Sequence, residues 1–484
     1  MKKLRGLLFL AVSFLFVMLF SRATSFLYVF EGADPSVFKQ MGLAVLKGKL
    51  LYIDYFDNKG CLLYFIHALG LWLGGDFFIL LMQALSLTVT LLIWDKLLEL
   101  GQNLRQRNLC LGVALLLLAC FYGAGDQTQE WCLPFISYPL LVFVRAFRNQ
   151  SEIKPRAILL VGLCFGVITF IQVNNACAFL GFVLYYWIQC LSRKAFRPLF
   201  QSVGCFVAGW LMVAVPCVLY FYVKAGGHGV YEMVYASFLS NFEYMGHQWK
   251  SHLTTIVPYC LFLVSWVALV ILDYRKNGNI HLPVLLSIFF FVVSFGRLCN
   301  AFYLNAMLPL CLVCMMTLDL ADKKVLKYGF YGIILMCLAF YISNPIYHLI
   351  NDWVLQKEQE TVIYQDFHHC VENIPEQDRD SIYNYNLYWH GTSMMQHEGL
   401  LQCNRVFFSA LVFNLPTLRR EETSKRNPPP KWILLSFDKH FENEDAYFIL
   451  ENYEQRCSFH YNKRLVNNSN FGDAFDVVLY RRRD

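Results

Sequence analysis

Residues 77–95 read FFILLMQALSLTVTLLIWD, and the only charged side chain in this stretch is the aspartate at its end. A helix of about 20 residues crosses the hydrocarbon core of a bilayer, so the stretch is long enough to span a membrane. It lacks the alternation of apolar and polar residues that marks a strand of a barrel, and only helices and closed barrels satisfy their backbone in lipid. We therefore predict a transmembrane helix here.

Runs of the same kind recur along the chain, which has 484 residues and is 57% hydrophobic and only 16% charged. We predict an all-α polytopic membrane protein with about 11 spans. The first follows two lysines and precedes no convincing small-residue cleavage site, so we expect a retained span. Residues 61–75 are apolar but too short to cross, so we expect them to lie at the membrane surface. The predicted spans lie near 6–21, 77–95, 108–123, 133–147, 156–172, 176–191, 199–222, 253–272, 281–296, 302–318 and 326–343.

Basic side chains gather in alternate loops between these spans. Short loops rich in lysine and arginine stay in the cytoplasm, so the charges predict a cytoplasmic N-terminus and an extracytoplasmic C-terminal segment. Because much of the net charge of +6 lies in these loops, we expect no nucleic-acid partner. The basic groups are Lys2, Lys3 and Arg5; Lys96, Arg105 and Arg107; Arg145, Arg148, Lys154 and Arg156; Arg193, Lys194 and Arg197; Arg275 and Lys276; and Lys323, Lys324 and Lys327.

The chain divides into two predicted domains. Residues 1–345 form the transmembrane domain, whose first external loop covers residues 22–76, and residues 346–484 form a small extracytoplasmic α/β domain. Alternating runs at 381–385, 432–437 and 476–480 are typical of strands. The cysteines of this tail indicate no disulfide framework, and its histidines lack metal-ligand spacing. These residues are Cys370, Cys403 and Cys457, and His368, His369, His390 and His397.

The first external loop contains the most informative chemistry. Its residues 31–38 read EGADPSVF, and its residues 48–60 read GKLLYIDYFDNKG. Asp34 before Pro35 predicts a helix start, with the aspartate as N-cap and the proline in the first helical position. An apolar stripe and a wetter face follow at helical spacing, so we expect a short helix along the outer membrane surface. The stripe is Val37, Met41, Ala44 and Val45, and the wetter face is Ser36, Lys39, Gln40 and Lys47.

Four acids lie in this loop together with Lys59, namely Glu31, Asp34, Asp54 and Asp57. An aspartate before a proline can be only a helix cap, worth about 1 kcal/mol, and the two later aspartates can be turn residues. Residue types alone leave the structural and the catalytic interpretations open. Carboxylates are costly at a membrane surface unless they are paired or used, which favours a functional site.

The two quoted segments resemble the first external loop of bacterial membrane glycosyltransferases of the C-type superfamily (GT-C, similar to glycosyltransferase family 39), in the branch that contains aminoarabinose transferases and protein O-mannosyltransferases. The shared pattern is Asp-x-x-x-Phe, a helix, and Gly-x-x-x-Tyr-x-Asp-x-x-Asp-x-Lys-Gly. The resemblance implies an inverting enzyme that moves a sugar from a polyprenyl-phosphate carrier to an acceptor hydroxyl on the outer face of the bacterial inner membrane. It implies that Asp34 is the general base, with Asp54 and Asp57 in supporting roles.

Two further external segments are similar to the same family. Residues 123–134 read GAGDQTQEWCLP and match Gly-Gly-Asn-x-Thr-Glu-Glu-Tyr-x-Leu-Pro, which implies that Glu130 positions the acceptor or binds a metal. The alternative is a solvated acid at a helix start. Arg297, followed by Tyr303 and Pro309, resembles a shortened Arg…His-Tyr…Pro pattern. This implies that Arg297 binds the donor phosphate together with Lys59, with Tyr303 supporting; the alternative is an arginine that touches lipid headgroups.

A polyprenyl phosphate is a good leaving group, so the implied reaction needs no general acid. It needs positive charge at the departing phosphate, from lysine, arginine or a divalent metal ion. The sequence has no compact metal motif, so a divalent metal ion stays open as a cofactor and no other is expected. The expected partners are the lipid-linked donor, membrane lipids and an acceptor that is a glycolipid, a polysaccharide or a protein.

The sequence departs from the family pattern at Asn58, Gln129, Gln172 and Ala301, which leaves a non-catalytic scaffold as one alternative. A second alternative is a transporter or flippase for lipid-linked glycans. A transporter places ionisable residues near the bilayer midplane and shows internal repeats. Because the acids of this chain gather at the outer surface and we find no repeat, we favour glycosyl transfer.

Overall fold

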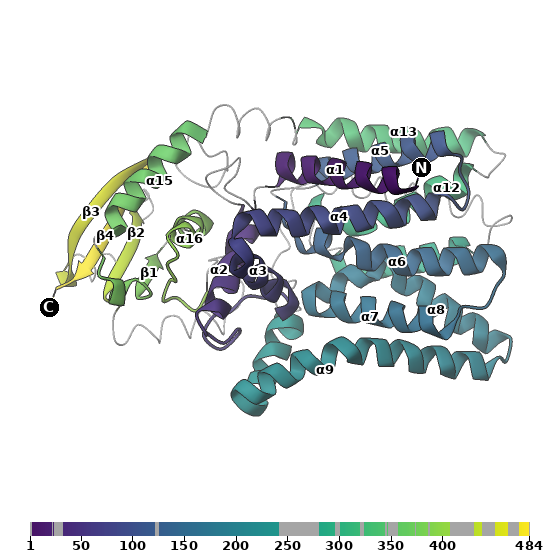
Figure 1. Ribbon diagram of the computed structural model, residues 1–484, viewed down its shortest axis with the longest axis horizontal. Helices are drawn as coiled ribbons and strands as arrows, with labels where there is room; N and C mark the ends of the chain where they lie inside the picture. Colours follow the sequence, from purple (N-terminus) through teal and green to yellow (C-terminus); the bar gives the residue numbers. More distant parts are fainter. Residues whose placement is uncertain are drawn as a thin grey trace.

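The structure, a computed structural model, describes residues 2–21, 23, 32–121, 125–241, 280–295, 301–319, 324–343, 346, 357–372, 374–385, 388–406, 430–437, 451–462 and 474–483. Figure 1 shows a bundle of long helices at one end of the molecule and a small sheet domain at the other. Two short helices, α2 (Ala33–Leu46) and α3 (Cys61–Gly74), lie between them. The first external loop is therefore the junction between the two parts.

The helices of the bundle coincide with the predicted spans that fall within the described ranges. A further helix covers residues 280–295, and a 3-10 segment, Ala301–Met307, precedes α12. The labelled helices are α1 (Lys2–Phe20), α4 (Asp76–Leu98), α5 (Leu104–Phe121), α6 (Thr128–Asn149), α7 (Pro155–Gln172), α8 (Cys177–Ser192), α9 (Phe196–Val234), α12 (Leu308–Asp319) and α13 (Lys324–Tyr341).

Five apolar stretches of the described residues are long enough to cross a membrane. The fourth contains both α7 and α8, and shorter apolar helices accompany these five. The span predicted near 253–272 lies outside the described residues, so the total of about 11 spans stays a prediction. The five stretches are Asp76–Leu98, Leu104–Phe121, Thr128–Asn149, Pro155–Ser192 and Phe196–Leu239.

The outward face of α9 is apolar. Large side chains along this helix are exposed over several turns, in a pattern that a soluble surface does not tolerate. The same side chains suit contact with lipid tails, which satisfies their hydrophobicity without a protein partner. They are Phe200, Val207, Leu211, Met212, Val215, Leu219 and Val223.

Helices α7 and α9 pack with their backbones in contact. A Cβ atom added to Gly162 would lie 2.0 Å from the carbonyl oxygen of Phe206, and one added to Gly209 would lie 2.0 Å from that of Leu159. Small residues at such a crossing allow the close approach by which membrane helices associate. This contact holds α9 beside the end of α7, where the first external loop also docks.

The first external loop contacts the end of α7 at Gly60, where there is no room for a side chain. We expect the replacement of Gly60 by alanine to destabilise the protein by about 2 kcal/mol. The backbone N–H of Gly60 donates to the carbonyl oxygen of Ile171 at 2.8 Å, and an added Cβ would lie 2.1 Å from the carbonyl oxygen of Phe170. Thermal unfolding in detergent measures the effect. Gly112→Ala is the matched control, because nothing lies within 4 Å of its added Cβ. Equal unfolding temperatures for the two variants would contradict this packing.

Charged side chains meet at the end of the bundle away from the sheet domain, where Figure 1 places the N-terminus. Arg5 donates to both carboxylate oxygens of Asp95, at 2.8 and 2.6 Å, and Arg107 lies 3.5 Å from the same carboxylate. The first two of the basic groups named above, one on α1 and one across the end of α4 and the start of α5, thus share one end. This arrangement agrees with the predicted clustering of basic loops opposite the tail, while the orientation in the membrane stays a prediction.

Helix α2 forms as predicted, but two details of the prediction are wrong. The helix begins at Ala33 with Gly32 as N-cap, so Asp34 lies inside the first turn instead of capping it. The predicted wetter face is buried at Ser36, Lys39 and Gln40, whose side chains are covered by α3 and by the sheet domain. Helical spacing locates an apolar stripe but does not show that a distant part of the chain covers the opposite face.

In the described part of the tail, the sheet domain has four strands in the order β1-β2-β4-β3. Strands β1 and β2 pair in parallel, whereas β4 pairs antiparallel with both β2 and β3. Three of the strands coincide with the predicted runs, and the sequence prediction missed β3. The elements are α15 (Lys357–Glu372), β1 (Ile382–Tyr385), α16 (Tyr388–His397), β2 (Trp432–Phe437), β3 (Tyr453–Asn462) and β4 (Ala474–Arg482).

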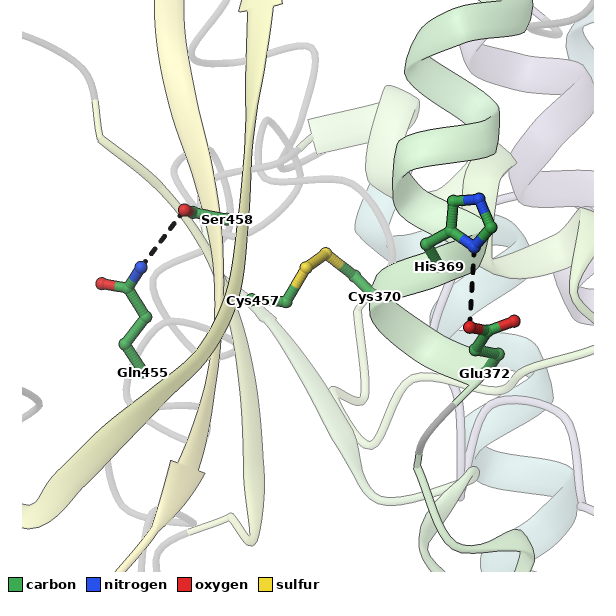
Figure 2. Close-up of a disulfide and its surroundings, with 6 residues drawn as sticks. All are labelled: His369, Cys370, Glu372, Gln455, Cys457 and Ser458. Carbon is green, nitrogen blue, oxygen red and sulfur yellow. Dashed lines mark hydrogen bonds and ion pairs between the residues drawn. A yellow bond between two sulfur atoms is a disulfide. The ribbon is translucent and has the colours of Figure 1, made fainter.

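A disulfide joins Cys370 of α15 to Cys457 of β3, with their Cα atoms 5.5 Å apart (Figure 2). The sequence prediction found no disulfide framework in the tail and missed this bond. The two cysteines are 87 residues apart in sequence, and only the packing of α15 on the sheet brings them together. Structural disulfides persist in oxidising compartments, so the bond agrees with an extracytoplasmic tail.

We expect the double substitution Cys370→Ser and Cys457→Ser to destabilise the sheet domain by about 4 kcal/mol, because the bond closes a long loop. Resistance of the tail to proteolysis in intact membranes measures this loss. In the wild-type protein a maleimide should label the exposed Cys403 directly but label Cys370 and Cys457 only after reduction. Labelling of Cys370 without a reductant would show that the bond does not form.

Candidate active site

Helices α2 and α3 form the floor of the candidate site. They cross closely, since a Cβ atom on Gly42 would lie 2.8 Å from the backbone nitrogen of Ala68. The ring of Phe38 lies between α2 and α3, with its centroid 5.6 Å from that of His67 and 6.4 Å from that of Tyr64. These contacts therefore fix the position of the first turn of α2 relative to α3.

Polar contacts, two of them at buried side chains of the helix and one at the exposed Lys47 that follows it, anchor α2 on two sides. The side chain of Lys39 is fully buried, and its Nζ lies 2.5 Å from the carboxylate of Asp76, at the start of α4. Gln40 donates to the backbone carbonyl oxygen of Leu400 at 3.0 Å, and Lys47 pairs with Asp380 at 2.6 Å. The helix is thus bound to the bundle at one residue and to the sheet domain at two others.

The sheet domain also pairs with the second half of the first external loop. The backbone N–H of Phe56 donates to the carbonyl oxygen of Arg405 at 2.7 Å. The guanidinium of Arg405 donates to the carbonyl oxygen of Tyr52 at 2.7 Å and to Glu232 of α9 at 3.1 Å. Residues far apart in the chain therefore fix the backbone that leads into Asp57 and Lys59.

Asp34 lies half-buried in the first turn of α2, where the helix dipole favours a negative charge. Burial is the main cause that raises the pKa of the Asp34 carboxyl above its ordinary value. The nearby charge of Lys59 opposes this shift, whereas the charges of Asp57 and Asp126 add to it. A carboxylate that does not cap its own helix and has a raised pKa is suited to accept a proton.

Lys59 lies beside Asp34 and is half-buried. Its Nζ donates to the side-chain oxygen of Asn58 at 2.6 Å and lies 6.0 Å from the centre of the Phe38 ring. Asn58 in turn pairs with Asn241, at the end of the segment that follows α9, through contacts of 3.2 and 2.9 Å. Asn58, one of the departures from the family pattern, therefore orients the lysine.

The two other aspartates of the loop have different surroundings. Asp57 is buried and accepts a hydrogen bond of 2.6 Å from the hydroxyl of Tyr64 in α3. Asp54 is exposed and accepts one of 2.6 Å from the backbone N–H of Leu50, within its own turn. The structure thus brings Asp57 to the site but gives Asp54 the contacts of a turn residue.

A buried pair that the sequence analysis did not single out lies under the site. Nε2 of His67 is 2.8 Å from the Asp126 carboxylate, which also accepts a hydrogen bond of 2.6 Å from the indole of Trp131. Asp126 follows Gly125 and has a positive φ of 57°, which is uncommon for a residue with a side chain. The glycines at 123 and 125 are a sequence signal of an unusual backbone before Asp126, and the positive φ of Asp126 is seen only in the structure.

Glu130 lies in the first turn of α6. Its carboxylate accepts a hydrogen bond of 3.2 Å from the backbone N–H of Gln127, which forms one half of a capping box. The helix-start interpretation of this acid therefore matches its geometry, while the acceptor or metal role stays a prediction. Its neighbour Gln129 donates at 3.3 Å to Gln172, so two departures from the family pattern contact each other.

The two remaining predicted residues are Arg297 and Tyr303. Arg297 falls outside the described residues, so its position is not part of the site geometry. Tyr303 is buried, and its ring packs on those of Phe295 and Phe302, with centroids 4.9 and 4.5 Å away. Within the described part of the chain, no three His, Cys, Asp or Glu residues are close enough together to hold a metal ion.

Comparison with known proteins bears on both the family and the fold. The family described as "Putative competence-induced protein Ccs4 N-terminal domain" matches residues 1–330. No curated protein sequence matches the chain. The crystal structure of ArnT from Cupriavidus metallidurans in the apo state is similar over 98% of this chain and 97% of its own, with 13% identity and a TM-score of 0.52. This likeness shows that the chain shares the fold of ArnT, and it supports the predicted polytopic helical fold with a small α/β domain.

Proposed function

The chain belongs to the family of the competence-induced protein Ccs4 N-terminal domain, and we propose that it is a membrane glycosyltransferase that acts at the outer face of the bacterial inner membrane. The proposed reaction moves a sugar from a polyprenyl-phosphate-linked donor to a hydroxyl group of the acceptor. The acceptor is a cell-surface glycolipid or a polysaccharide, with a protein as the third possibility. The GT-C-type fold supports this proposal, because the similar structure is that of ArnT.

One observation carries the proposal: a carboxylate and an ammonium group lie close together at the junction of bundle and sheet domain. Asp34 and Lys59 interact electrostatically, and both side chains are half-buried. The carboxylate suits the acceptor, whose hydroxyl must lose a proton. The ammonium suits the donor, whose phosphate gains negative charge.

In the proposed step, the acceptor oxygen forms a bond to the anomeric carbon while Asp34 takes the hydroxyl proton. The bond between that carbon and the phosphate oxygen breaks, and its electron pair leaves with the polyprenyl phosphate. Lys59 stabilises the departing phosphate, and by the family resemblance Arg297 assists it. Attack opposite the leaving group inverts the configuration of the anomeric carbon.

The surroundings of the pair support an acceptor site on the outer side. The sheet domain contacts the first external loop through hydrogen bonds of Gln40 and Arg405. The domain also contains a disulfide, which agrees with a location outside the cytoplasm. A divalent metal ion would add positive charge at the departing phosphate, and treatment of the purified protein with a chelator tests whether transfer depends on one.

Mass spectrometry of surface glycolipids and polysaccharides, in cells with and without the gene, tests the function. We expect a glycosylated product only with the gene, and accumulation of the lipid-linked sugar without it. Vesicles that already hold the donor in the outer leaflet separate the two classes of function. A transferase is still required for product formation there, whereas a transporter or flippase is not.

A further inference from the structure

A cavity lies between α1, α4, α5 and α6, near the ends of these helices that lead into the external loops. It is small, with room of about 20 Å³ for one water-sized group such as a hydroxyl, and it is partly open to the surroundings. Its walls include Leu87, Leu118 and the ring of Trp131, and its polar groups include Gln83 and Glu130. The described walls thus combine an apolar body with a few polar groups, as ligand pockets do.

Gln83 is a buried polar residue for which the described protein provides no hydrogen-bond partner. Its side chain is 6% exposed, and neither its amide oxygen nor its amide nitrogen has a hydrogen-bond partner within the described structure. A buried amide without partners is destabilising, because its polar atoms have lost water and gained no hydrogen bond. Two other polar residues of α4, Thr88 and Thr90, donate to carbonyl oxygens of their own helix. Gln83 alone of these three faces the cavity, which suggests that a ligand completes its bonds.

The chemistry of the amide selects the ligand group. The amide oxygen needs a donor and the amide nitrogen needs an acceptor, and a hydroxyl supplies both, whereas an ammonium supplies no acceptor. A phosphate is disfavoured, because Glu130 is the one charged side chain among the described walls. The indole N–H of Trp131 already donates to Asp126, so its ring contributes only apolar surface.

We propose that this cavity binds the hydroxyl group of a membrane lipid, with Gln83 as its hydrogen-bonding partner. Gln83 lies about two turns below the start of α4, a depth that a headgroup of the same leaflet can reach. The leucines around it then contact the apolar chain of the lipid. This inference does not depend on glycosyl transfer, since it concerns a wall of the bundle away from Lys59.

Photolabelling of the full chain in lipid nanodiscs tests the proposal. The probe is a long-chain alcohol with a diazirine beside the hydroxyl, compared with an alkyl phosphate and an alkane that carry the same group. Because one hydrogen-bonded group is worth about 0.5–1.5 kcal/mol, we expect the alcohol to label the peptides of α4 and α6 about 2- to 10-fold more than the other probes. Unlabelled alcohol should compete with this labelling in the wild-type protein.

Gln83→Leu should remove the preference for the alcohol, because it deletes the amide that would form hydrogen bonds to the hydroxyl. Thr88→Val is the matched control on the same helix and should leave labelling unchanged. Equal labelling by alcohol and alkane, or a preference that survives Gln83→Leu, would overturn the proposal. The first of these results would mean that ordered water completes the amide. The competition measurement in wild-type protein decides the matter if the Gln83 variant does not fold.

Discussion

The Asp34→Asn variant should lose sugar transfer by about 10²- to 10⁴-fold while it keeps the fold. An amide has the shape of the carboxylate but cannot accept the proton of the acceptor hydroxyl. Gly32, and not Asp34, is the N-cap of α2, so the substitution removes no helix cap; it does remove the charge that interacts with Lys59. Product formed per unit of purified protein, with lipid-linked donor in nanodiscs, measures the loss. The matched control is Asp476→Asn, an exposed carboxylate on β4.

The pH dependence gives this prediction a second readout. Because burial raises the pKa of Asp34, the base is lost to protonation at a higher pH than an ordinary carboxyl, and transfer should fall there. A carboxyl with a raised folded-state pKa favours folding below its unfolded pKa and loses that contribution as pH rises through the folded value. Asp34→Asn should therefore be at least as stable as the wild type at neutral pH. Retained transfer, or a marked loss of stability, would rule out the role of base.

The sequence predicts the local structure of the first external loop well, since that structure follows from short-range patterns. The sequence predicts a helix with Asp34 as N-cap and Pro35 in the first helical position, and in the structure the helix begins two residues earlier, at Ala33. The apolar run 61–75 is too short to span and forms α3, which ends at Gly74. Such features depend on helix propensity and on bilayer thickness, and no distant residue is needed to infer them.

The environment of the site could not be predicted, because it is made by residues far away in the chain. The sequence predicts that Gln40 is solvated, whereas in the structure its side chain donates to the backbone carbonyl oxygen of Leu400 in the tail. In the sequence, His67 is one residue of an apolar helix with no sign of a partner. In the structure its ring contacts Asp126, which lies 59 positions later in the chain. Burial converts both from surface residues into specific contacts, and a periodic pattern carries no information about a partner of that kind.

Two departures from the family pattern illustrate the same limit. Taken singly, Gln129 and Gln172 each replace a charged residue of the pattern and weaken the resemblance. In the structure they lie together, and Thr128 also donates to the Gln172 amide oxygen. A neutral amide pair needs no counter-ion, so the two changes are compatible when they occur together. The departures therefore argue less strongly for a non-catalytic scaffold than the sequence alone suggests.

Lys59→Met should lower kcat/KM by about 10²- to 10³-fold, the usual effect of removing one group that stabilises developing charge. Methionine keeps most of the length and the apolar stem of the side chain, but it loses the ammonium and with it the contact with the Phe38 ring and the charge proposed to stabilise the departing phosphate. The lysine charge also lowers the pKa of Asp34, so its removal should move the acidic limb of the pH–rate profile to higher pH. This second effect separates an electrostatic role in the site from a merely structural one.

Lys47→Met is the matched control for this prediction, because Lys47 follows α2 and pairs with Asp380 on the sheet domain instead of facing Asp34. It should keep near wild-type transfer with an unchanged pH profile. If Lys59→Met behaved like Lys47→Met, the phosphate charge would have to be stabilised elsewhere, by Arg297 or a metal ion. If transfer were lost but the acidic limb stayed in place, the lysine would act on the donor without setting the protonation of the base.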